Sequence, residues 1–142
     1  MKPNLFSNKN LLAVVVLFYS IFCYSQEPND CVNAITVCGN SSFVFDVNGI
    51  GIQEVEGRNN CGSRENNSIW FQITIAESGT LAFTLTPEST SISEDYDFFL
   101  FGPNATCGNL GQTIRCSTTN PQAASQGNNL TGMSPNDPDP NE

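Results

Sequence analysis

Three carboxylates open the most distinctive segment of this chain. Glu94, Asp95 and Asp97 lead directly into the aromatic run 98–101, which a Gly-Pro break ends. Side chains two apart on a strand point the same way, so Asp95 and Asp97 share a face. Carboxylate oxygens are ligands for Ca²⁺, although the ion needs about six to eight of them. The residues therefore predict either a weak calcium site or an acidic strand end that is simply solvated or pairs with Arg115.

A secretory signal peptide is predicted over residues 1–25. Two lysines precede an apolar run at 11–22, and Ser25 stands at the boundary with polar sequence. This order is typical of a cleaved leader, and the run is shorter than the roughly 20 residues of a membrane span. The alternatives are an uncleaved anchor or a lipoprotein at Cys23, where bulky Phe22 disfavours lipid attachment. We expect a secreted or outer-surface protein with no stable membrane span after cleavage.

The chain that remains after cleavage is strongly acidic. Three arginines stand against fourteen aspartates and glutamates, a formal net charge of −11. Nucleic-acid binding requires a basic face that displaces counterions, so we expect no nucleic-acid partner. The acidity fits solubility or cation binding outside the cell.

Catalysis is disfavoured by the residues that are missing. Histidine is absent, and lysine occurs only at positions 2 and 9. Ser-His and Cys-His nucleophiles, histidine zinc sites and Schiff-base chemistry therefore have no basis. A carboxylate pair can still perform glycosidase-type hydrolysis, but a short β-rich chain offers little room for a deep cleft. We expect no enzyme.

Five cysteines follow the leader, and an exported chain should oxidise them to disulfides. Cys107 and Cys116 lie nine positions apart in a Gly/Asn-rich loop, and we predict that they pair. One further pair is expected among Cys31, Cys38 and Cys61, which leaves an odd thiol. No Cys-x-x-Cys spacing suggests a zinc site.

Alternating apolar residues predict strands at 42–47, 68–75 and 80–86, with an aromatic strand at 95–101. A short Gly turn should join the second and third strands into a hairpin. Residues 33–37 fit either a helical turn or an edge strand. The predicted fold is all-β, an antiparallel β-sandwich in which the aromatic strand is central and covered on both faces.

Aromatic side chains on these strands allow two interpretations. The domain needs them for its core, but they would also suit a carbohydrate-stacking platform. The candidates are Trp70, Phe71, Tyr96 and Phe98.

The end of the chain changes character after residue 117. Leu130 and Met133 are its only sizeable apolar residues, and prolines and acids dominate 134–142. The segment is either a disordered linker or a long loop inside a domain whose last strands lie beyond Glu142. Four strands are fewer than a closed sandwich contains, so we expect a partial module at 26–133 and a tail or truncated loop at 134–142.

Several motifs resemble a known family when they are taken in order. They are Asn29-Asp30-Cys31, Cys38-Gly39-Asn40, the stretch 65–71, Asp95-Tyr96-Asp97-Phe98, Thr106-Cys107-Gly108-Asn109, the stretch 114–121 and Asn129-Leu130-Thr131-Gly132-Met133. Their order and spacing are similar to the N-terminal region of gliding-motility-associated surface proteins that carry a type IX secretion sorting domain. The module is similar in turn to pre-peptidase C-terminal (PPC) domains, which are small jelly-roll-like β-sandwiches. The resemblance covers about residues 29–133.

What the resemblance implies is a non-catalytic adhesion or interaction module of an exported bacterial cell-surface protein, which would bind a surface protein or polysaccharide. It also allows an accessory module of a larger secreted enzyme, binding carbohydrate or calcium through residues such as Glu94, Asp95 and Asp97. A small Glu/Asp hydrolase is the third hypothesis. Members of this family continue beyond the Thr-Gly-Met segment, and the sequence here shows no sorting domain.

Overall fold

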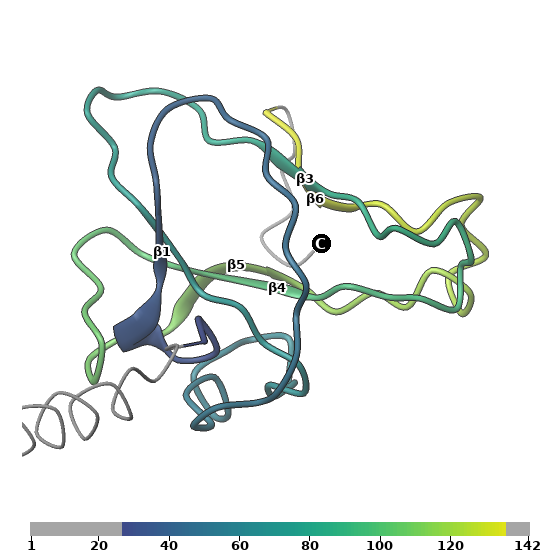
Figure 1. The fold of residues 1–142 in the computed structure, drawn as a ribbon, viewed down its shortest axis with the longest axis horizontal. Coiled ribbons are helices and arrows are strands. Elements are labelled where there is room, and N and C mark those ends of the chain that lie inside the picture. The colour runs from purple at the N-terminus through teal and green to yellow at the C-terminus, as the bar shows by residue number, and fades with distance from the viewer. Residues whose placement is uncertain (1–26, 136–142) are drawn as a thin grey trace, which may run out of the picture.

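A computed structural model describes residues 27–135 (Figure 1). Within them the chain forms one 3₁₀ turn and short β-strands, so the predicted all-β class is confirmed. The elements are η2 (Cys31–Asn33), β1 (Ile35–Val37), β2 (Phe71–Ile73), β3 (Phe83–Leu85), β4 (Phe98–Phe101), β5 (Thr113–Ser117) and β6 (Thr131–Met133). The predicted signal peptide and residues 136–142 of the predicted tail lie outside the described residues.

The strands pair into three two-stranded sheets. β1 and β2 are parallel, with Ile35 opposite Phe71. β3 is antiparallel to β6, and β4 is antiparallel to β5 with an irregularity between Leu100 and Phe101. No strand pairing joins the three sheets within residues 27–135, so the sandwich stays a prediction.

The predicted hairpin of 68–75 with 80–86 is wrong. β2 pairs with β1, and β3 pairs with β6, which lies almost fifty residues later in the sequence. A tight hairpin turn uses residues with positive φ. Gly79, the turn residue, is not among the glycines with positive φ, so its backbone does not supply that geometry.

The aromatic strand is shorter and less central than predicted. β4 covers only 98–101 and bonds to β5 alone among the described residues. Phe98 is buried, and the other three side chains are half-buried. The predicted strand at 42–47 is exposed along almost its whole length and joins no sheet within residues 27–135.

The segment after Ser117 is a long connection inside the fold and not a linker. It returns as β6 beside β3, and Pro121 within it is fully buried. Figure 1 shows this connection running beside the one between β3 and β4 at one end of the molecule. Residues 33–37 combine the two forms that the sequence left open, since η2 ends at Asn33 and β1 begins at Ile35.

The predicted disulfide pattern is also wrong. Cys31 is bonded to Cys107, and Cys61 to Cys116. Cys38 is the odd thiol, and it is exposed. Cys107 lies in a tight turn, whereas Cys116 is buried in β5 opposite Phe99. The turn and the strand place the two cysteines in different parts of the fold, so their nearness in sequence gives no bond.

The apolar core of the described chain is small. Its buried hydrophobic residues are Val55, Phe98, Leu110 and Cys116. Two disulfides that each close a long loop supply stability that such a core does not.

Candidate functional site

The acidic segment lies at the start of β4, beside the connection from β5 to β6. The Asn120 amide donates to Asp95 Oδ2 at 3.4 Å, while Asp95 Oδ1 is buried without a hydrogen-bond partner among the described residues. Although Asp97 is exposed as a residue, partial burial of its carboxyl raises the pKa to about 6, and the charge of Asp95 adds to this rise. The two aspartates thus lie close enough to repel each other, as their shared strand face predicts.

A buried asparagine fixes the loop that precedes these acids. The Asn129 amide nitrogen donates to the carbonyl oxygens of Ser89, Ser91 and Glu94 at 2.8, 3.1 and 3.3 Å. An amide has two hydrogens, so one of them is shared between carbonyls. The side chain therefore ties the loop before β4 to the segment before β6.

No group of three or more acids or cysteines is arranged to hold a metal ion within residues 27–135. Asp95 and Asp97 interact, whereas Glu94 accepts a 3.4 Å hydrogen bond from the Tyr96 hydroxyl. The predicted calcium ligands Glu94, Asp95 and Asp97 thus provide at most part of a shell, and calcium binding stays a prediction.

Three other acids hold the backbone in place. Glu65 is buried and accepts from Trp70 Nε1 at 2.9 Å and from the Glu54 backbone amide at 2.5 Å. Glu54 in turn accepts from the backbone amide of Cys31, and Asp30 accepts from that of Ile52. These carboxylates link loops that are distant in sequence, as hydrogen bonds between strands do in a sheet. They therefore hold segments that lack regular structure.

The candidate stacking aromatics are divided among separate ring clusters. Trp70 stacks on Phe101 at 5.8 Å, and Phe98 meets Phe83 edge to face at 5.0 Å. Phe71 contacts other rings on a different part of the fold. Of the four candidates only Phe98 belongs to the buried core, and the described contacts do not assemble the four residues into one carbohydrate platform.

The most exposed aromatic surface is formed by Phe43, Phe45 and Phe71, which we call the aromatic face. The three ring centroids lie 5.7, 6.1 and 5.7 Å apart, and Phe43 and Phe45 remain 45% and 41% exposed. Ile73 shares the Phe71 side of β2 and is also exposed. The alternation at 42–47 indicates that Phe43 and Phe45 lie on the same side of the segment. It does not indicate that these rings are exposed, because exposure depends on whether the segment pairs with another strand.

Three carboxylates lie near Tyr96, which is itself partly exposed. The pKa of its phenol is raised, first by burial and then by the charge and hydrogen bond of Glu94. Glu88 and Asp46 also raise this pKa through their charges. Asp46 belongs to the same segment as Phe43 and Phe45, so negative charge lies beside the aromatic face.

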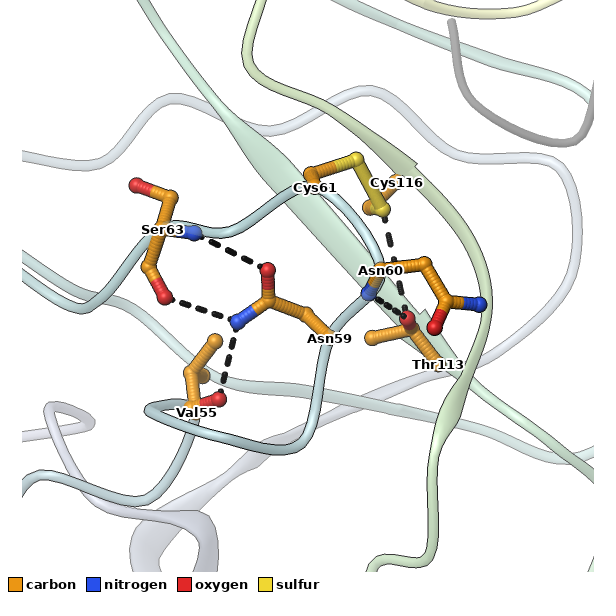
Figure 2. Close-up of a disulfide and its surroundings, with 7 residues drawn as sticks. All are labelled: Val55, Asn59, Asn60, Cys61, Ser63, Thr113 and Cys116. Carbon is orange, nitrogen blue, oxygen red and sulfur yellow. Dashed lines mark hydrogen bonds between the residues drawn. A yellow bond between two sulfur atoms is a disulfide. The ribbon is translucent and has the colours of Figure 1, made fainter.

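The Cys61 loop contains a polar pocket that sequence reasoning missed. Its volume is about 430 Å³, and its lining includes Glu56, Ser63, Arg64 and Asn66. Figure 2 shows Asn59, another lining residue, bonded to Val55 and Ser63, next to the Cys61–Cys116 disulfide. The lining contains no aromatic ring, whereas small-molecule pockets are mostly apolar. The pocket is therefore a weaker candidate than the aromatic face.

No protein-family model matches the chain, and no curated protein or solved structure matches it either. Within residues 27–135, no helix has the length and apolar character required to cross a membrane.

Proposed function

We propose that this chain is a non-catalytic interaction module of an exported bacterial cell-surface protein, where it contributes to adhesion. The observation that carries the proposal is the aromatic face, because exposed apolar surface of this kind marks interaction sites. The two disulfides suit an oxidising compartment. The motif resemblance over residues 29–133 supports the same class of protein.

The roles of the acids also support a non-catalytic module. Glu54, Glu65 and Asp30 accept hydrogen bonds from backbone amides or from an indole, which is a structural task. The chain contains no histidine that could activate a nucleophile.

Retention of the labelled protein on outer-membrane vesicles from a gliding Gram-negative bacterium tests the proposal. We expect retention that Phe43→Ser/Phe45→Ser removes and that Ile114→Ser, a change at an exposed apolar residue of β5, leaves intact. Val44→Asp should also lower retention. This side chain is 97% exposed, so the change does not disturb packing. Protease treatment of the vesicles distinguishes a protein ligand from a polysaccharide. Equal retention of all variants, or no retention at all, contradicts the proposal.

A calcium-binding accessory module is the second candidate. Asp95 Oδ1 is buried without a partner in the described chain, and a cation would relieve its repulsion with Asp97. Titration calorimetry with Ca²⁺ should then show binding that Asp95→Asn abolishes. Absence of both heat and a melting shift would end this candidate.

A further inference from the structure

The segment 42–47 is an extended chain whose backbone is unpaired. Its residues alternate in polarity as a strand does, yet no hydrogen bond links their N–H or C=O groups to other residues of 27–135. In Figure 1 the chain leaves β1 at the top and descends as a single extended trace. Val44 is 97% exposed, so solvent reaches the middle of this segment.

Ring contacts hold the segment in place even though its backbone is free. Phe43 and Phe45 both pack on Phe71 of β2, with centroids 6.1 and 5.7 Å away. A strand that is already extended and anchored by its side chains loses less conformational entropy when another strand pairs with it. An exposed row of unpaired N–H and C=O groups is the template that strand addition uses.

The charges near the segment indicate the chemistry of its partner. Asp46 lies within the segment, and its charge reaches the Tyr96 phenol together with those of Glu88 and Glu94. The exported chain also carries a formal charge of −11, which opposes the close approach of a second copy. A basic partner is instead attracted by the same negative charges.

We propose that residues 42–47 are an acceptor edge for β-strand addition by an extended partner segment in which basic residues alternate with apolar ones. The partner backbone bonds to the edge, its apolar residues cover the aromatic face, and its Lys or Arg residues approach Asp46, Glu88 and Glu94. This inference rests on the proposed function, since it names the binding mode and partner class of the same face.

Nuclear magnetic resonance (NMR) titration of the isotope-labelled protein with a nonapeptide of alternating lysine and valine tests the inference. We expect shifts and hydrogen-exchange protection at the amides of 43–47. Binding should weaken as salt rises, because the attraction is between exposed charges. A peptide with glutamate in place of lysine, and one with N-methyl groups along its pairing edge, should not bind.

Variants separate backbone pairing from side-chain contact. Val44→Pro removes one amide donor at a fully exposed position and should weaken peptide binding about tenfold or more. Val44→Thr keeps the donor and the β-branch, so it is the matched control and should bind like the wild type. Asp46→Asn combined with Glu88→Gln should reduce both the affinity and its salt dependence.

Other outcomes overturn the inference and leave the proposed function to its own test. Vesicle retention that requires Phe43 and Phe45 but is unchanged by Val44→Pro rejects strand addition while the interaction module stands. A dimer that Val44→Pro dissolves makes a second copy the occupant. Amides at 43–47 that are protected without peptide show that the protein's own chain covers the edge. No peptide binding, with vesicle retention also absent, removes both proposals.

Discussion

Single side chains perform much of the work that strand pairing performs in most β-proteins. Asn29 donates to the carbonyls of Asn48, Gly49 and Ser68, and Asn129 bridges three other carbonyls. Both are buried, so losing either amide would leave several carbonyls unsatisfied at a cost of about 1–3 kcal/mol. These two asparagines are thus structural residues, in addition to the turns that an Asn-rich composition normally indicates.

The raised pKa of Asp97 should make stability depend on pH in an unusual direction. A carboxyl with a pKa near 6 in the folded protein and 3.8 as its ordinary value binds its proton more tightly when folded. The contribution of this carboxyl to the free energy of unfolding is therefore fully present below about pH 4, and it is lost as pH rises through 6. Asp97→Asn should remove this fall in stability. Denaturant melts of the variant and the wild type at pH 4, 5, 6 and 7 would measure the difference in their free energies of unfolding. An unchanged difference across this range would show that Asp97 is not the group responsible.

At the scale of elements, the strands are too short to fix their own pairing. Five of the six contain three or four residues, and β2 joins a partner more than thirty residues earlier in the sequence. Alternation located β2 and β3, and the consecutive aromatic residues located β4, but both signals overestimated the strand lengths, since they report which residues suit a strand and not which partner is present. The segment 42–47 has the alternating pattern of a strand but no partner strand within residues 27–135. Its unpaired backbone is therefore the candidate interaction edge.

The pairing of β3 with β6 should depend on Gly132. A Cβ at this position would overlap the carbonyl oxygen of Phe83, so the two strands approach as closely as they do only because the residue is glycine. Gly132→Ala should cost about 1–3 kcal/mol of stability and expose the amides of β3 to hydrogen exchange.

Gly127→Ala is the matched control for this change, because an added Cβ there meets nothing within 4 Å and the residue lies in the connection that leads into β6. Equal stability of the two variants would contradict the proposed close approach.

For the whole molecule, two long covalent loops hold together parts that regular structure does not join. The bonds span 76 and 55 residues, and loop closure of this length is worth about 4 kcal/mol each in the chain-entropy view. This is large against the few buried apolar side chains. Reduction should therefore unfold the protein and not merely loosen one loop.

Tryptic mapping of the non-reduced protein distinguishes the disulfide pattern directly. Cleavage after Arg58, Arg64 and Arg115 places four bonded cysteines in four peptides. The structure predicts that peptide 59–64 is linked to 116–142, and that 65–115 is linked to the peptide ending at 58. A link between 65–115 and 116–142 would instead restore the pair expected from sequence spacing.

Composition and short-range patterning predicted the all-β class, three of the strand positions, the use of disulfides and the acidic character of the segment before β4. These properties follow from composition and from period-two alternation, which act over a few residues. Tertiary structure decided the cysteine pairs, the β1–β2 and β3–β6 pairings and the exposure of Phe43 and Phe45. Each of these depends on contacts between residues far apart in the chain. Local sequence does not encode such contacts, because the same short pattern fits a buried strand, an edge or an unpaired segment.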